Sequence, residues 1–221
     1  VGDQDLAANS LLAGAIAAQE NLNINRAAYL YENVLEVLPP EDSRRFTACM
    51  ALGKILVARG QHQDAIVVFQ ESGSHPTALL ELASAHLLAG KYEEAVTAAE
   101  PLLAQEIPQR DLAEVITARS LLLGAKLEES GAVIQTAISR GQPHPLAPRL
   151  MATRGLIAYY RGQMDDARKD IESAYQSAHG LQDPENLDLI RATLAMLLHK
   201  SGDPSGALTL YEQSLQAARK D

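Results

Sequence analysis

The sequence contains no tryptophan, and aromatic residues make up only 4% of its 221 residues. β-Sheet proteins depend on aromatic and β-branched side chains, whereas alanine and leucine, which are abundant here, favour helices. The single cysteine, Cys49, cannot form an intramolecular disulfide, which argues against a small secreted fold stapled by disulfides. Its apolar surroundings, FTACMALG, predict a buried core residue.

Long apolar runs and basic blocks are also missing. No apolar run approaches the ~20 residues that a transmembrane helix needs, so we expect no direct membrane insertion. The stretch LLAGAIAA is too short and lacks a basic leader, which argues against a signal peptide. The 19 basic and 28 acidic residues give a formal net charge of −9. Such a surface repels phosphate backbones, so nucleic acid is not an expected partner.

The sequence shows no recognisable catalytic motif. Its six histidines form neither an HExxH pair nor a Cys/His cluster with zinc spacing, and no glycine-rich phosphate loop or GxSxG motif occurs. We therefore expect no metal, no cofactor and no enzymatic activity. Three acidic pairs stand at the expected starts of helices, where they stabilise the helix dipole better than they could form a catalytic dyad. These pairs are Glu93–Glu94, Glu128–Glu129 and Asp165–Asp166.

A glycine closes five successive apolar segments of the chain. These glycines are Gly60, Gly90, Gly124, Gly162 and Gly202, and they lie 30, 34, 38 and 40 residues apart. Glycine just past a helix end adopts a left-handed conformation without a Cβ clash, which lets the chain reverse. Alanine stands five residues after the glycine in four of the five segments. The exception is the segment of Gly124, where a small residue, Ser130, stands six residues after the glycine. The pattern predicts pairs of antiparallel helices that cross at a small residue.

Two further positions recur with the glycines. The side chain four residues after the small residue fills the space beside the crossing, and the set is Phe69, Ala99, Ile134, Ile171 and Tyr211. Seven residues before each glycine the residue is small or of modest size, and this set is Gly53, Ala83, Thr117, Gly155 and Ala195. Glycine in mid-helix costs about 0.5–1 kcal/mol relative to alanine, so we expect a neighbouring helix to approach closely there.

The repeated unit resembles the tetratricopeptide repeat (TPR) family, whose unit of about 34 residues pairs two antiparallel helices. The stretches LGKILVARGQHQDAIVVFQ, LASAHLLAGKYEEAV, GLIAYYRGQMDDARKDI and LAMLLHKSGDPSGALTLY carry the resemblance. A weaker first unit places Gly14, Ala27 and Tyr31 at matching positions, with a lengthened turn NLNIN. The resemblance implies an all-α fold, a right-handed superhelical solenoid, and a generic helical bundle is the alternative. We expect one domain over 1–221 with six repeats, at 5–39, 44–76, 77–108, 110–143, 146–184 and 186–220.

In this family the first helix of each repeat lines a concave groove and the second faces outward. Aligning the turn glycines transfers the groove positions to this chain. The expected groove residues are Met50, Lys54, Leu80, Ser84, Leu87, Ala118, Leu121, Leu156, Tyr159, Tyr160, Met196 and His199. This mostly apolar surface with a few polar side chains suits an amphipathic helix or an extended apolar peptide. For Leu87 and Leu121, packing between repeats is an equally good interpretation.

The favoured function is a non-catalytic scaffold that binds a protein or peptide partner in this groove. The alternative is the sensor or regulatory segment of a larger signalling or transcription-regulatory protein, which the long last two repeats and the start at Val1 suggest. A small-molecule enzyme is the least favoured hypothesis. We expect a soluble protein, in the cytoplasm by preference or in a bacterial periplasm or envelope, and the excess of arginine over lysine hints at a bacterial source. The partner and the oligomeric state stay open.

Overall fold

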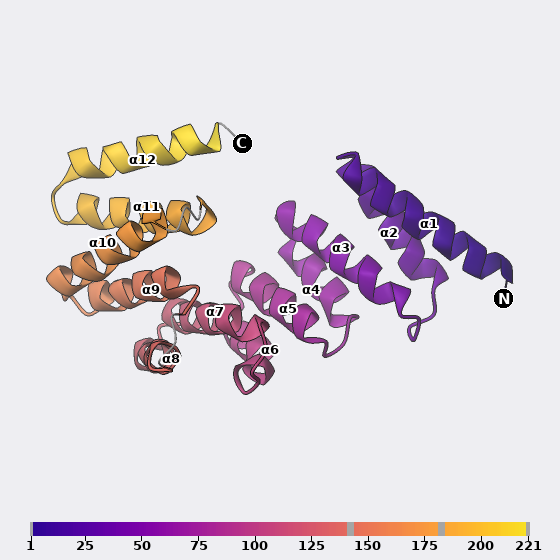
Figure 1. Cartoon of the computed structure of the whole chain (residues 1–221), viewed down its shortest axis with the longest axis horizontal. Helices are drawn as coiled ribbons and strands as arrows, with labels where there is room; N and C mark the ends of the chain where they lie inside the picture. Colours follow the sequence, from indigo (N-terminus) through magenta and orange to yellow (C-terminus); the bar gives the residue numbers. More distant parts are fainter. Residues whose placement is uncertain (1, 141–143, 181–183, 220–221) are drawn as a thin grey trace. The chain divides into compact units, whose positions relative to one another are not determined.

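The computed structural model describes residues 2–140, 144–180 and 184–219, and within these ranges it contains twelve α-helices and no β-strand. The helices alternate along the chain as first and second members of antiparallel pairs (Figure 1). The first helices are α1 (Gly2–Glu20), α3 (Arg44–Ala58), α5 (Pro76–Leu88), α7 (Gln109–Leu123), α9 (Ala147–Tyr160) and α11 (Pro184–Lys200). The second helices are α2 (Ile24–Val37), α4 (His62–Gln70), α6 (Tyr92–Leu103), α8 (Leu127–Ile138), α10 (Met164–Gly180) and α12 (Pro204–Ala218). The expected all-α repeat fold is confirmed.

The chain divides into two compact units, residues 1–116 and 117–221, which are called the N-terminal and C-terminal units below. The boundary falls within α7. In the N-terminal unit one hydrophobic core extends from α1 to α5. In the C-terminal unit α9 packs against α10, α10 against α11, and α11 against α12. The expectation of a single domain over 1–221 stays a prediction, and residues 141–143 and 220, where two of the expected repeats end, lie outside the described residues.

Each helix pair turns through the same hydrogen-bonded motif. The second residue after each first helix, called the turn residue below, has a positive φ of 58–89°. The residue that follows it donates its N–H to the carbonyl oxygen five residues back, at 2.8–2.9 Å. This is the Schellman arrangement, which satisfies carbonyl groups that would otherwise lack partners at a helix end. The six turn residues are Leu22, Gly60, Gly90, Ala125, Gly162 and Gly202.

Two of these turn residues differ from the sequence-based expectation. Gly124 was expected to reverse the chain, but Ala125 has the positive φ, of 61°. The NLNIN turn was expected to be lengthened, but Leu22 makes the same motif, in which Asn23 donates to Ala18. The earlier interpretation was wrong because it required glycine. The hydrogen bonds of the motif hold a non-glycine residue in the left-handed region, where strain costs about 1–2 kcal/mol.

With the corrected turn residues, all six repeats share one register. Five residues after the turn residue the side chain is small and fully or almost fully buried; the set is Ala27, Ala65, Ala95, Ser130, Ala167 and Ala207. Seven residues before the turn residue, every repeat has alanine or glycine, and these residues are Ala15, Gly53, Ala83, Ala118, Gly155 and Ala195. Counted from Ala125 and not from Gly124, Ser130 stands at the same distance of five residues, so the fourth repeat has no extra residue. The Ser130 hydroxyl donates to the carbonyl oxygen of Ala118 at 2.7 Å, which ties α8 to α7.

The expected close approach in mid-helix is confirmed at both glycines. A Cβ atom built on Gly53 would lie 2.5 Å from Cζ of Phe69, whose ring is fully buried. A Cβ atom on Gly155 would lie 2.5 Å from Cγ1 of Ile171. Both partners occupy the position nine residues after the turn residue. The helices of these two repeats can therefore pack at this distance only because the first helix lacks a side chain there.

Candidate functional site

The candidate groove consists of three positions on each first helix, which stand ten, six and three residues before the turn residue. We call these positions the first-helix face. The corrected turns change two repeats. In α1 the face consists of Leu12, Ile16 and Gln19, which the sequence interpretation omitted because it aligned on glycine. In α7 the face consists of Val115, Arg119 and Leu122, and the expected Ala118 and Leu121 are not part of it.

The first-helix face of the N-terminal unit combines apolar residues with one ion pair. Met50 is 9% exposed and packs into the core, whereas Lys54 is exposed. The ammonium nitrogen of Lys54 lies 3.2 Å from Oε1 of Glu81, so the pair joins α3 to α5. The remaining expected residues are half-buried, and they are Leu80, Ser84 and Leu87 of α5.

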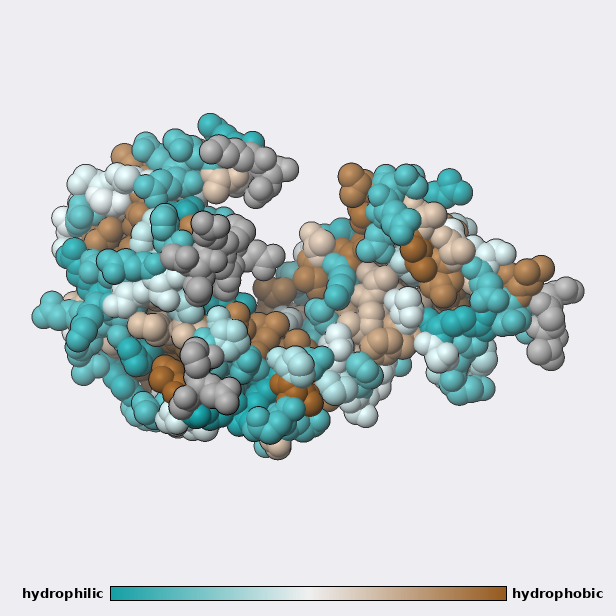
Figure 2. All heavy atoms as spheres, viewed as in Figure 1, coloured by the Kyte–Doolittle hydropathy of each residue, from teal (hydrophilic) through white to brown (hydrophobic). Residues whose placement is uncertain are grey.

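The first helix of the chain adds apolar surface to this unit. Leu12 is half-buried, and Ile16 is 40% exposed. Gln19 accepts a hydrogen bond from the hydroxyl of the buried Tyr31 at 2.9 Å, which fixes its position on α1. Figure 2 shows hydrophobic residues over α1 and α3 among hydrophilic ones. Aligning the repeats on Leu22 would have found these residues from the sequence.

In the C-terminal unit the first-helix face contains Tyr159, and a second tyrosine, Tyr160, adjoins it. Leu156 and Tyr159 are half-buried on α9, and Tyr160 beside them is 61% exposed. The rings of the two tyrosines meet edge to face with centroids 5.4 Å apart. Helix α11, which contacts α9 directly, contributes the half-buried Met196 and the exposed His199. Two adjacent first helices of one unit thus carry four of the expected groove residues, which are Leu156, Tyr159, Met196 and His199.

Two expected groove residues of α7 are instead packing residues. Ala118 has no exposed surface, and its carbonyl oxygen accepts the Ser130 hydroxyl. Leu121 is 6% exposed. The alternative interpretation of Leu121 as a packing residue therefore agrees with its burial. At the corrected positions of α7, Val115 and Leu122 are also packing residues, at 2% and 3% exposed, and Arg119 is half-buried. Burial lowers the pKa of the Arg119 guanidinium.

Cys49, which the sequence predicted as a core residue, is buried, and so is His86. Cys49 has no exposed surface, and burial raises the pKa of its thiol, which makes it a poor nucleophile at neutral pH. His86 is 7% exposed, and burial lowers the pKa of its imidazole. Neither residue contributes reactive surface.

The net negative charge of the chain lies in its N-terminal unit. Residues 1–116 contain 7 basic and 16 acidic residues, a formal net charge of −9. Residues 117–221 contain 12 of each, so their net charge is zero. The two units therefore present different electrostatic surfaces to partners.

Among the described residues, none of the helices combines the length and apolar character that crossing a membrane requires. A comparison with curated proteins finds no match.

Solved structures with the same fold are numerous. A tetratricopeptide repeat protein from Parabacteroides merdae is 15% identical with a TM-score of 0.70, and the alignment covers 96% of this chain and 80% of that one. A thermophilic TPR protein from Thermus thermophilus is 24% identical with a TM-score of 0.65, over 80% of this chain and 93% of that one. TPR-like repeats of a Podospora anserina kinesin light chain homologue are 21% identical with a TM-score of 0.60, over 79% and 95%.

The sequence itself matches two family models, both described as tetratricopeptide repeat. One covers residues 80–145 and the other residues 147–220. Together they include four of the six helix pairs, and the remaining two pairs share the same turn motif and packing positions. The chain belongs to the tetratricopeptide repeat family.

Proposed function

We propose that this chain is a non-catalytic scaffold whose first-helix face binds an apolar or amphipathic segment of a protein partner. Tetratricopeptide repeats are generally protein–protein interaction scaffolds. The observation that supports the finer proposal is the set of incompletely buried apolar residues on the first helices of each unit. These residues are Leu12, Ile16, Leu80 and Leu87 in the N-terminal unit and Leu156, Tyr159 and Met196 in the C-terminal unit.

The partner segment of the N-terminal unit should also carry positive charge. This unit has a net charge of −9, and like charges disfavour an acidic segment whereas opposite charges accelerate association. The Lys54–Glu81 pair supplies one donor and one acceptor beside the apolar side chains. An amphipathic helix with apolar residues at i, i+3, i+4 and i+7 and basic flanks matches this combination.

A pair of matched variants tests the proposal. Leu80→Glu places a charge on the first-helix face of the N-terminal unit, and Val67→Glu places the same charge on α4, where Val67 is 52% exposed. Partners captured from the native source are compared for the wild type and both variants, with helicity checked by circular dichroism. Loss of a partner with Leu80→Glu and its retention with Val67→Glu is the expected result. Retention in both variants, or equal loss in both, contradicts the proposal.

The alternative, that these repeats form the sensor or regulatory segment of a larger protein, stays a prediction. The length and domain content of the complete gene would test it.

A further inference from the structure

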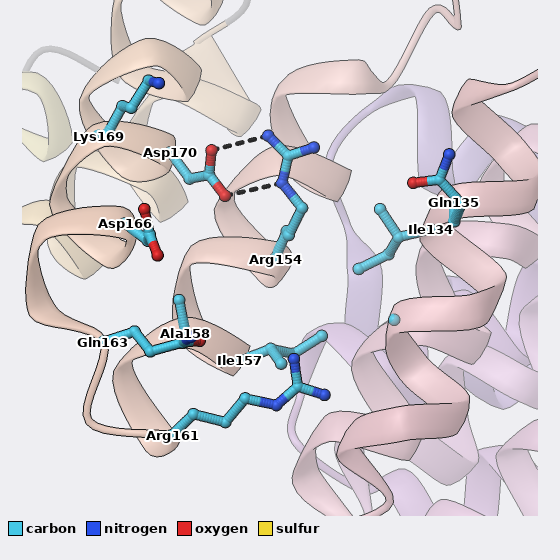
Figure 3. Close-up of a pocket in the computed structure, with 11 residues that line it drawn as sticks. Ile134, Gln135, Arg154, Ile157, Ala158, Arg161, Gln163, Asp166, Lys169 and Asp170 are labelled. Carbon is cyan, nitrogen blue, oxygen red and sulfur yellow. Dashed lines mark hydrogen bonds and ion pairs between the residues drawn. The ribbon is translucent and has the colours of Figure 1, made fainter.

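A cavity of about 320 Å³ opens in the C-terminal unit between α8, α9 and α10 (Figure 3). Gly131 of α8 is one of its lining residues and stands six residues after the turn residue Ala125. The other five repeats all have a side chain at this position, and these residues are Ala28, Ile66, Val96, Arg168 and Leu208. A Cβ atom on Gly131 would meet no atom within 4 Å. Packing therefore does not require glycine here, although glycine costs a helix about 0.5–1 kcal/mol relative to alanine.

The floor of the cavity is apolar and lies on the side of α9 away from the first-helix face. Ile134 of α8 and Ile157 and Ala158 of α9 are all at least nine-tenths buried. Because successive helix residues are 100° apart, Arg154 and Arg161 point about 140–160° away from Leu156. The cavity is thus separate from the proposed groove and independent of it.

Arg154 of α9 and Arg161, the residue that follows α9, flank this floor. Arg154 donates from Nε and Nη2 to both carboxylate oxygens of Asp170 at 2.7 Å, and the pairing raises the pKa of Arg154 (Figure 3). Nη2 of Arg161 lies 2.6 Å from Oε1 of Glu128, whose side chain is 89% exposed. The Nη1 groups of both arginines take part in neither pair, so donors remain for a ligand.

The polar lining favours a carboxylate over a more highly charged anion. Arg154, Arg161 and Lys169 set three positive charges against those of Asp166 and Asp170, and this formal net charge of +1 matches a monoanion better than a dianion such as phosphate. A single carboxylate matches the planar fork of a guanidinium group. Gln135 and Gln163 also line the cavity, and their amides can both donate to and accept from a peptide backbone. The volume is at the lower end of the ~300–1,000 Å³ of ligand pockets, which suits a short peptide segment better than a helix.

We propose that this cavity binds a peptide segment of a partner in which an apolar side chain lies over Gly131 and a neighbouring acidic side chain binds the free guanidinium nitrogens of Arg161 and Arg154. The apolar side chain fills the space that other repeats fill with their own residue. Arg161 is the principal anchor, because its existing partner Glu128 is exposed to solvent and easily displaced.

The test uses the full chain, labelled with ¹⁵N, and two dipeptides. N-acetyl-leucyl-glutamyl amide carries the carboxylate, and N-acetyl-leucyl-glutaminyl amide is its neutral isostere. Titration at low salt should give saturable amide shifts around Gly131, Gln135 and Arg161 with the acidic peptide. The neutral peptide should bind about tenfold or more weakly, because a charge-assisted hydrogen bond is lost.

Variants separate the site from general effects. Gly131→Val, which introduces the residue that the preceding repeat has at this position, should abolish the shifts while the far-ultraviolet spectrum is retained. Arg161→Gln should weaken the acidic peptide about tenfold and remove its advantage over the neutral one. Arg168→Gln is the matched control, since Arg168 is an exposed arginine of α10 that pairs with Glu172 outside the cavity, and it should leave binding unchanged.

Several outcomes would overturn this assignment. They are the absence of saturable shifts, equal binding of the two peptides, unchanged binding in Gly131→Val, and tighter binding of inorganic phosphate than of the acidic peptide. Leu80→Glu should not affect this titration, so failure of the cavity and failure of the proposed groove can be distinguished.

Discussion

Alanine in place of Gly53 would insert a methyl group into the space of the Phe69 ring. The new Cβ atom would lie 2.5 Å from Cζ and 2.8 Å from Cδ1, and closer still to Cε1. The ring has no exposed surface, so it cannot swing into solvent. Overpacking costs about 1–3 kcal/mol, and three contacts below van der Waals distance place this site at the upper end of the range. Alanine recovers about 1 kcal/mol of helix propensity, which leaves a net destabilisation of about 2 kcal/mol.

The same substitution at Gly131 should have the opposite sign. No atom lies within 4 Å of the added Cβ, so only the gain in helix propensity remains, about 0.5–1 kcal/mol. Urea denaturation followed by circular dichroism measures both variants, and a shift of the midpoint at constant slope reports the change in stability. Two chemically identical changes should therefore differ by about 3 kcal/mol.

A double-mutant cycle identifies the cause. In a Phe69→Ala background the clash is gone, so Gly53→Ala should become neutral or stabilising. The next repeat already has this combination, with Ala83 and Ala99 at the two positions. If Gly53→Ala is as stable as the wild type, or if its effect is unchanged in the Phe69→Ala background, contact between these two residues does not set the helix spacing.

The remaining predictions concern burial at equivalent positions and pH. Phe69→Ala should lower the free energy of unfolding by about 3–5 kcal/mol, because the ring is fully buried. Tyr211→Ala, at the same repeat position but 46% exposed, should lower it by less than about 2 kcal/mol. Equal losses of stability in urea denaturation would refute the comparison. Burial lowers the pKa of His86 below its ordinary 6.5, so the unfolded chain takes up the proton first and stability should fall as the pH drops below about 6.5. His86→Phe should reduce that dependence, and an unchanged pH profile would show that other groups cause it.

The sequence alone determined the helices and their pairing. Small residues at fixed distances from each turn and larger residues opposite them, such as Gly53 with Phe69, specify which faces of two helices meet, because a short intrahelical spacing fixes the relative direction of side chains. The same spacings carry the resemblance to the tetratricopeptide repeat family, and the two family models show the membership. A prediction from glycine positions does not reach Leu22 and Ala125, because their left-handed conformation is enforced by the Schellman hydrogen bonds of the folded chain and leaves no compositional signal.

The role of Gly131 follows from the tertiary structure alone. The repeat position of Gly53 and Gly155 predicts a neighbouring helix beside them, whereas the structure shows that Gly131 faces open space. It likewise decided that Ala118 packs against α8 while Tyr160 faces solvent. The physical reason is that the exposure of a position and the space beside it depend on atoms contributed by other helices. These atoms are distant in sequence, and a local pattern contains no information about the distance to them.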